Sequence, residues 1–377
     1  MPAEIEGIRS ADVHAKIKLL IDGMVNIKDK TGEFLLRLED GRVIDTKGWN
    51  DWEWTHGIGL YGIWKYYELT GDARWIQIIE SWFAKRFAAG GTTKNINTMA
   101  VFLTLADLER TRFGGMQHVT YVSLHDEQLW DDTLMMTVLP LAKIGLVLNR
   151  PHYVTEAKRQ FLVHVQYLFD TKTGLFFHGW EFYRAGTGEG KLGHNFAEAR
   201  WARGNSWLTI AIPEFIELLD LDVVTDPVGS HLRGVLEAQC AALILQQAPS
   251  GLWRTLLDIP EDEGSYVETS ATAGFAFGIL KSRRKRYLDP STPVAAPESN
   301  DCQRLNKAER GGYDAATVRA IKAVLDNVNA DGELISTSFG TAMGNTLQHY
   351  KDIPVTSMPY GQAMAIMALV EFLRAYV

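Results

Sequence analysis

Two adjacent carboxylates stand at the start of a strongly apolar segment near the middle of the chain. Residues 129–136 read Leu-Trp-Asp-Asp-Thr-Leu-Met-Met, so Asp131 and Asp132 follow a tryptophan and precede apolar side chains. Such surroundings make a carboxylate costly to ionise and can raise its pKa toward neutrality, where one acid can both donate and accept a proton. Acids at the start of a helix are, however, usually caps. Spacing alone favours capping and leaves the choice between the two acids open.

Helix geometry separates the two acids. If a helix begins here, Asp132 shares a face with three apolar side chains, Met135, Met136 and Leu139. Asp131 then points about 100° away from that face. We therefore expect Asp132 to face an apolar wall and Asp131 to cap or pair elsewhere. Burial would raise the pKa of Asp132 and the helix dipole would lower it, so the net direction stays open.

A second candidate is residues 201–207, Trp-Ala-Arg-Gly-Asn-Ser-Trp. Trp201 and Trp207 flank Arg203, whose planar guanidinium suits a carboxylate, while tryptophan faces suit sugar rings. A tryptophan-lined core with an exposed arginine explains the same pattern equally well.

Three further stretches carry polar groups beside aromatic or apolar ones. His178 lies in Phe-Phe-His-Gly-Trp, where a lone histidine is more often a structural hydrogen-bonding group than a catalyst. Residues 95–98, Asn-Ile-Asn-Thr, precede an apolar segment, and spacing favours a cap there. The aromatic density of residues 49–57 predicts the rim of a funnel, with the roles of Trp52, Trp54 and His56 left open.

Composition excludes several classes of protein. The formal net charge is −8 and hydrophobic residues make up 46% of the chain, which is typical of a globular protein with a large core. We find no basic stripe with interleaved aromatics, so no nucleic-acid partner is expected. The two cysteines exclude a disulfide framework and show no metal-ligand spacing. Without a signal peptide or a long apolar run, the sequence predicts no membrane span and a cytoplasmic location.

Helical periodicity dominates the chain. It predicts helices over 12–28, 56–69, 73–88, 97–110, 132–148, 152–169, 205–220, 230–247, 269–283, 314–329 and 360–376. Glycine turns followed by short extended pieces recur between them, near Gly114, Gly174, Gly251 and Gly332. Repeated helical hairpins of this kind predict a toroid with a central funnel. Its inner helices should be the more apolar segments 56–69, 132–148, 205–220, 269–283 and 360–376.

The domain organisation is predicted to be simple. Residues 284–312 form the clear irregular stretch, with a basic run followed by three prolines. We interpret it as a surface loop, because helical hairpins continue beyond it. Residues 1–377 are therefore predicted to form one domain.

Several motifs, taken in order, resemble one enzyme family. The chain resembles the unsaturated rhamnogalacturonyl hydrolases, glycoside hydrolase family 105. That family is related to the family 88 unsaturated glucuronyl hydrolases. The matching segments are residues 59–72, 95–98, 129–132, 177–179, 201–207 and 359–362. The Trp-x-Asp and Trp-Ala-Arg-Gly-Asn-x-Trp pieces are the more specific ones. The resemblance implies an all-α (α/α)6 barrel and a substrate with a 4,5-unsaturated uronic acid at its non-reducing end, as pectin lyases produce. It places the catalytic acid on Asp132 and assigns the pocket to Trp130, His178, Trp201, Arg203, Trp207 and Asn97.

The implied chemistry needs one acid rather than the usual pair of glycosidase carboxylates. The substrate is a vinyl ether: an acid protonates C4, water adds at C5, and the hemiketal opens to release the aglycone. Asp131 stands where the family usually has an apolar residue, and we treat it as structural. No metal or cofactor is required. One departure is the stretch near 108–118, where the expected outer helix is shortened or missing.

Other functions remain open at this point. The first alternative is an unsaturated uronyl hydrolase for another glycan. The second is an αα-barrel sugar epimerase or isomerase, which usually relies on a pair of funnel histidines. The third is a non-catalytic carbohydrate-binding toroid, which would not need Asp132. The expected partner is an oligosaccharide substrate, and the expected state is a monomer or weak homo-oligomer.

Overall fold

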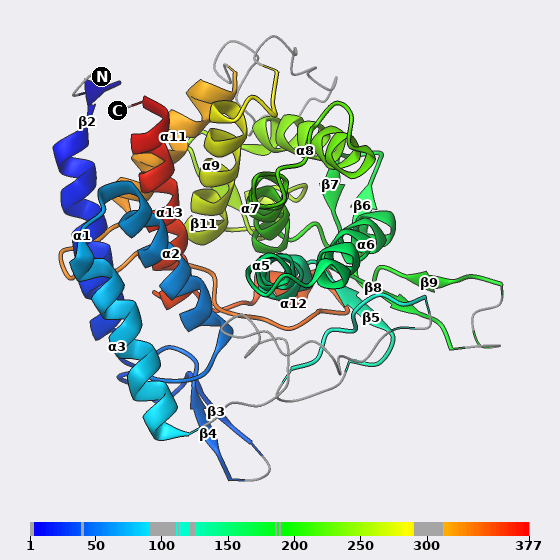
Figure 1. Ribbon diagram of the computed structural model, residues 1–377, viewed down its shortest axis with the longest axis horizontal. Helices are drawn as coiled ribbons and strands as arrows, with labels where there is room; N and C mark the ends of the chain where they lie inside the picture. Colours follow the sequence, from blue (N-terminus) through cyan, green and yellow to red (C-terminus); the bar gives the residue numbers. More distant parts are fainter. Residues whose placement is uncertain are drawn as a thin grey trace.

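The chain winds as alternating inner and outer helices around a ring (Figure 1). The computed structural model describes residues 4–38, 41–90, 111, 113–120, 125–184, 187, 190–289 and 312–376. Among the helices it describes, none is long and apolar enough to cross a membrane. The predicted helix 97–110 and its Asn97 lie outside the described residues.

The five segments predicted as inner helices form the inner layer. They are α2 (Trp54–Thr70), the π-helical turn η1 (Leu134–Val138) that continues as α5 (Leu139–Val147), α7 (Ala202–Leu218), α9 (Thr269–Arg284) and α13 (Pro359–Tyr376). Neighbours pack in the order α2, α13, α9, α7, α5. Helices α7, α9 and α13 are buried along almost their whole length. A helix without a polar face is stable only in such a position.

The outer layer consists of amphipathic helices that bury one face against the inner ones. They are α1 (Ser10–Asn26), α3 (Ala73–Ala89), α6 (Pro151–Leu168), α8 (Pro227–Gln246) and α11 (Tyr313–Asp326). Asp72 caps α3 and Pro151 is the first residue of α6, positions that both residue types favour at the start of a helix. A short helix, α12 (Leu347–Lys351), was not predicted.

Short strands connect the hairpins. They are β1 (Glu4–Ile5) with β2 (Ile8–Arg9), β3 (Leu35–Arg37) with β4 (Val43–Asp45), β6 (Phe169–Asp170) with β7 (Leu175–Phe176), β10 (Trp253–Arg254) with β11 (Val267–Glu268), and a sheet in the order β5 (Gln128–Trp130), β8 (Gly179–Phe182), β9 (Gly193–His194). A 3-10 turn, η2 (Glu261–Glu263), precedes β11.

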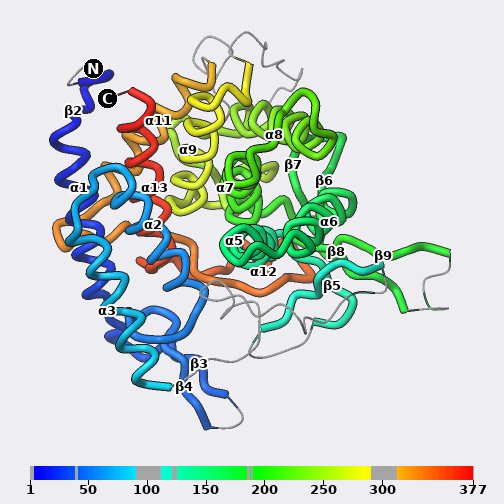
Figure 2. Tube along the Cα trace, in the orientation of Figure 1, coloured from blue at the N-terminus to red at the C-terminus, as the bar shows by residue number. Residues whose placement is uncertain are grey.

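The recurring glycine turns close the ring. Gly174 follows outer helix α6 and lies against outer helix α8, where a Cβ would come within 2.8 Å of the Ala238 carbonyl oxygen. Gly332 follows the last outer helix, α11, and lies against the first, at Leu19 of α1. Both turns have a positive φ, which glycine adopts without strain. The turn after one outer helix thus packs on the next, and the last returns to the first. Figure 2 shows the two chain ends on the same side of the ring, where α1 contacts α13.

Two stretches were predicted to be irregular, near 108–118 and over 284–312, and the described residues of both agree with this. Residues 113–120 and 125–127 form no helix. This agrees with the prediction that the outer helix near 108–118 is shortened or missing. Residues 108–110 and 112 lie outside the described part. Helix α9 ends at Arg284, and the rest of the predicted loop is described only at 285–289 and 312.

A buried charge network joins three inner helices. Glu214 of α7 accepts hydrogen bonds from Lys65 of α2 at 3.1 Å, from Tyr61 of α2 and from Lys281 of α9. Burial alone would raise the pKa of Glu214, but the two lysines outweigh it and lower the pKa to about 2. Nothing in the local sequence of α7 announces this network, because its members come from three separate helices.

We expect Glu214→Gln to lower the free energy of unfolding by about 3 kcal/mol, because it removes the buried charge that two ammonium groups share. Among the described residues, Lys65 then keeps only the partly exposed Glu68 as a counter-charge, and Lys281 only the partly exposed Glu217. Glu214 has a folded pKa below its ordinary 4.5, so its contribution is present above pH 4.5 and disappears as the pH falls toward about 2. Urea unfolding at several pH values measures this. Glu237→Gln, which breaks a partly exposed pair with Arg233 within one helix, is the matched control and should change stability by about 0.5 kcal/mol or less. Equal losses in the two variants would contradict the network.

Candidate active site

Strand register brings two distant segments of the sequence together. Strand β5 pairs antiparallel with β8, with Trp130 opposite Gly179. The Asp131 backbone N–H continues the pairing by donating to the His178 carbonyl oxygen at 3.0 Å. The residues just after β5 and just before β8 are therefore neighbours. This places the side chain of His178 beside that of Asp132.

The Asp132 carboxylate is held by two donors and opens into a pocket. His178 Nε2 lies 3.2 Å from Oδ2, and Trp207 Nε1 donates to Oδ1 at 3.1 Å. The side chain is 16% exposed. Burial would raise its pKa, but the hydrogen bond that His178 donates outweighs burial and keeps the pKa of Asp132 below its ordinary value. The expected apolar wall is thus incomplete, because a histidine and an indole N–H face the acid.

His178 is oriented from behind by Tyr350 of α12. The Gly344 N–H donates to the Tyr350 hydroxyl oxygen at 3.1 Å, and the hydroxyl proton goes to His178 Nδ1 at 2.8 Å, a nearer and stronger acceptor than Met343 Sδ at 3.4 Å. Burial lowers the pKa of His178, so the ring is neutral at neutral pH. We assign its proton to Nε2 from this network, since Nδ1 is occupied as an acceptor. His178 therefore donates to Asp132, which favours its ionised form.

Asp131 behaves differently from its neighbour. Its side chain is completely buried, and neither carboxyl oxygen has a hydrogen-bond partner among the described residues. The prediction that it caps the helix is wrong. The carboxyl lies on the first turn of α7, where a Cβ at Gly204 would come within 2.1 Å of Oδ2. A helix N-terminus favours a carboxylate by at most about 2 kcal/mol. Burial and the charge of Asp132 exceed this and raise the pKa of Asp131 well above its ordinary value.

The first turns of α7 supply Arg203 and Trp207, which share a face because they are four residues apart. Arg203 is buried, so the interpretation as an exposed arginine is wrong. It donates to the carbonyl oxygens of Ser338 at 2.6 Å and Phe339 at 2.8 Å. Its guanidinium also lies 4.2 Å from the Trp201 ring. Arg203 thus holds a pocket loop in place. The expected sugar-stacking role of Trp207 needs correction, because Trp207 is fully buried and meets the site through its hydrogen bond to Asp132.

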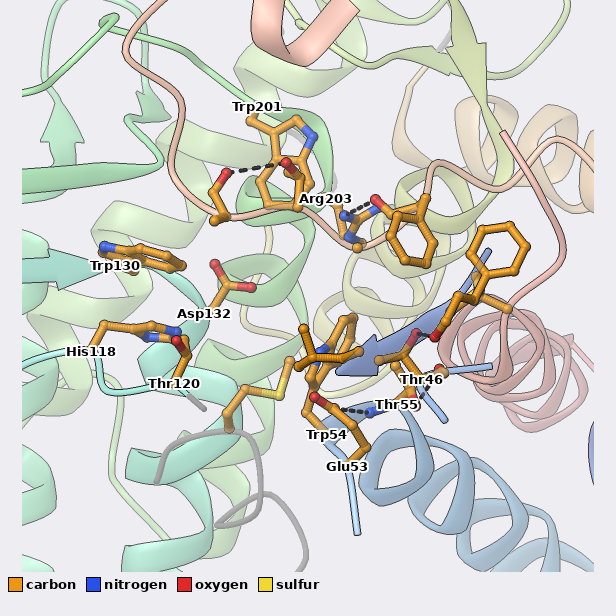
Figure 3. Close-up of a pocket in the computed structure, with 18 of the residues that line it drawn as sticks. Thr46, Glu53, Trp54, Thr55, His118, Thr120, Trp130, Asp132, Trp201 and Arg203 are labelled. Carbon is orange, nitrogen blue, oxygen red and sulfur yellow. Dashed lines mark hydrogen bonds between the residues drawn. The ribbon is translucent and has the colours of Figure 1, made fainter. Parts of the chain in front are cut away.

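The pocket has a volume of about 420 Å³, which is sufficient for a small ligand. Figure 3 shows Asp132 between Trp130 on one side and Trp54 on the other, with Trp201 and Arg203 along a further wall. Residues 33–36 of the β3 region and the loop 339–342 also contribute to the lining. Of the predicted pocket residues, the structure places Trp130, Trp201 and Arg203 in the lining, and His178 and Trp207 directly behind Asp132.

Two lining histidines were missed. His118 stacks on Trp130 with the ring centroids 4.0 Å apart, and its Nδ1 lies 2.9 Å from the Thr133 hydroxyl. His125 contacts the same indole at 4.6 Å. Burial lowers the pKa of His118 to about 3, so it is neutral. Both histidines lie in an irregular stretch without periodicity, so no sequence signal links them to Asp132. Trp54, whose role was open, stacks on Tyr360 and lines the pocket.

Comparison with known proteins identifies the family. A family model described as Glycosyl Hydrolase Family 88 matches residues 26–109, 105–298 and 305–376. Over 350 residues the chain is 27% identical to "Unsaturated rhamnogalacturonyl hydrolase YesR" of Bacillus subtilis, covering 86% of this chain and 90% of that protein.

Solved structures agree with this match. A possible member of the GH105 family from Salmonella enterica serovar Paratyphi A is 51% identical with a TM-score of 0.88, covering 100% of this chain and 97% of that one. The unsaturated glucuronyl hydrolase of Bacillus sp. GL1 is 16% identical with a TM-score of 0.64 and covers 97% of both chains, which shows the shared fold. The predicted all-α (α/α)6 toroid is confirmed. The chain belongs to glycosyl hydrolase family 88 and is a glycoside hydrolase.

Proposed function

We propose that the enzyme removes a 4,5-unsaturated uronic acid from the non-reducing end of rhamnogalacturonan oligosaccharides produced by pectin lyases. Asp132 is the proton-transfer group in this proposal. The observation that carries it is the carboxylate of Asp132, which is fixed by His178 and Trp207 and whose exposed edge opens into the pocket. The names of the relatives support the substrate class, since YesR and two more distant proteins are called unsaturated rhamnogalacturonyl or rhamnoglycuronyl hydrolases.

The reaction follows from the polarity of the substrate. The ring oxygen donates electron density into the C4=C5 bond, so C4 takes a proton from the Asp132 carboxyl and positive charge develops at C5. The Asp132 carboxylate then removes a proton from the water that attacks C5. The resulting hemiketal opens, C1 becomes an aldehyde, and the aglycone leaves. Each proton that Asp132 donates is recovered from water, so one carboxyl group suffices.

The pocket favours an anionic sugar. Trp54 is the first residue of α2, Arg203 the second residue of α7 and Met358 the residue before α13, and all three line the pocket. Three inner helices therefore direct their N-terminal ends at the pocket. Helix N-termini carry partial positive charge, which favours carboxylates, and at α2 the carboxylate of Glu53 already uses it by accepting the Thr55 N–H. The partly exposed ring of Trp54 offers an apolar surface for the opposite face of the sugar.

Incubation with lyase-generated rhamnogalacturonan fragments tests the proposal. We expect the absorbance of the conjugated double bond to disappear as the aglycone is released, while saturated fragments are left intact. Loss of absorbance only with unsaturated fragments of another glycan would support the first alternative. Isomerised free sugar would support an epimerase, and binding without turnover would support a carbohydrate-binding toroid.

The proposed cytoplasmic location is tested by fractionating the source cells.

We expect Arg203→Lys to raise the KM for the unsaturated fragment about tenfold with little change in kcat. A lysine ammonium cannot reach both loop carbonyls in the planar fork that arginine uses, so the pocket loop loses its position. Steady-state kinetics measure KM and kcat separately. Arg283→Lys, at an exposed pair with Asp314, is the control and should leave KM unchanged. A fall in kcat with normal KM would place Arg203 in the chemistry instead.

A further inference from the structure

Asp131 places a second carboxyl group behind Asp132 that the proposed reaction does not use. Both side-chain oxygens are buried and lack a hydrogen-bond partner among the described residues, although nearly all buried polar atoms in proteins have one. A carboxyl oxygen of Asp131, a carboxyl oxygen of Asp132 and a ring nitrogen of His178 all lie within 4.8 Å of one another. A group so close to the reacting carboxylate and so poorly satisfied requires an explanation.

The surroundings of Asp132 favour its ionised form, although the reaction needs it protonated. To protonate C4 it must carry a proton, yet His178 and Trp207 both donate to its oxygens and favour the ionised form. Asp131 has the opposite environment, since no described side chain donates to it and its neighbour is an anion. Two carboxyl groups this close do not both ionise readily, so one proton stays with the pair.

We propose that Asp131 and Asp132 share a single proton, which rests on Asp131 and passes to Asp132 for the reaction. The proposal rests on the function proposed above and adds a residue to it. Asp131 touches no substrate and acts through Asp132, so it is a positioning residue. The absence of a side chain at Gly204 leaves the space for its carboxyl group.

The proton balance closes over one turnover. The O–H bond of Asp131 breaks as an O–H bond forms on Asp132. That proton then moves to C4, and the former π electron pair becomes the C4–H bond. At this point both carboxyls are ionised and the sugar carries the positive charge. Water adds at C5 and gives a proton to Asp132, which returns it to Asp131. No other acid or oxidant is needed.

Four ionisable groups act on Asp131 from the surrounding elements: Asp132, His178, Arg203 and Tyr350. Only the backbone N–H of Asp132 and the charge of Arg203 favour ionisation of Asp131 among the described groups, and the guanidinium of Arg203 is already engaged by two backbone carbonyls. His178 is neutral and its proton is directed at Asp132, while Tyr350 directs its hydroxyl at His178. The arrangement therefore keeps the proton on Asp131 in the resting enzyme.

The pH profile of Asp131→Asn tests the proposal. Asparagine keeps the size of the side chain but holds no transferable proton, so Asp132 must take each proton from solvent. We expect kcat of the variant to fall about tenfold per pH unit between about pH 5 and pH 8, while wild-type kcat stays flat. Asp226→Asn, at the cap of α8, is the matched control and should keep the flat profile. Parallel profiles for Asp131→Asn and wild type would overturn the proposal.

Spectroscopy tests it without relying on turnover. Infrared difference spectra at neutral pH should show a protonated carboxyl band in wild type that Asp131→Asn lacks. Carboxyl ¹³C NMR of wild type labelled at aspartate gives the same readout without a substitution. If the band is absent, or if Mg²⁺ or Ca²⁺ raises the Tm of wild type but not of Asp131→Asn, the cluster is ionised and the proposal fails. If unsaturated fragments are not consumed but the band is present, the proposed function fails while the shared proton stands.

Discussion

Asp132→Asn should reduce kcat on unsaturated fragments by about 10⁴-fold, with a KM within about threefold of wild type, because one carboxyl supplies both the acid and the base step. The amide keeps the shape of the side chain, and its oxygen still accepts the N–H of Trp207. The pocket walls are unchanged, so binding should persist while proton transfer is lost. The rate of loss of double-bond absorbance under saturating substrate measures the effect.

The control is the same chemical change at a carboxylate outside the pocket. Asp226→Asn at the cap of α8 should leave kcat unchanged, because asparagine caps helices as well as aspartate. The folded pKa of Asp132 lies below its ordinary 3.8, so its carboxylate stabilises the fold above that pH. The stability difference between wild type and Asp132→Asn should therefore shrink as the pH falls below 3.8. Full activity in Asp132→Asn would contradict the proposed mechanism, even if the enzyme acts on the proposed substrate.

The helices could be predicted from sequence because their patterns are strong. Inner segments such as α13 are apolar around most of their circumference, and outer ones such as α6 have a single apolar face, so both the elements and their layers follow from composition and period. Asp132 was separated from Asp131 by helix geometry and by the resemblance to a family. Both arguments use residues close together in the chain.

The partners of Asp132 could not be predicted in this way. His178 lies 46 residues away and reaches Asp132 through the register of β5 and β8, which depends on a pairing of very short strands. Arg203 appeared suited to a ligand carboxylate, yet in the fold the loop carbonyls of Ser338 and Phe339, 135 residues or more away in sequence, take its N–H groups. Asp131 was expected to cap a helix and instead lies buried against Gly204. These are tertiary contacts with no local signature.

His178→Ala should lower kcat about 100-fold, because a hydrogen bond to a charged group contributes about 1.5–3 kcal/mol and this one also fixes the orientation of the reacting carboxyl. Without the His178 donor, ionisation of Asp132 becomes harder and its pKa should rise from its lowered value. The limb of the kcat profile on which activity falls with rising pH should move to higher pH in consequence. A pH series of initial rates on the unsaturated fragment measures both changes, and an unchanged limb with a lower plateau would mean that His178 only shapes the pocket.

Tyr350→Phe separates orientation from hydrogen bonding at the same histidine. The variant leaves His178 in place but removes the hydroxyl proton that occupies Nδ1. The ring can then carry its proton on Nδ1, in which case Nε2 no longer donates to Asp132. We expect about a tenfold loss in kcat and a smaller shift of the alkaline limb in the same direction as in His178→Ala. If Tyr350→Phe matched wild type while His178→Ala was impaired, the tautomer would be fixed by Asp132 itself, and Tyr350 would serve only to pack against the ring.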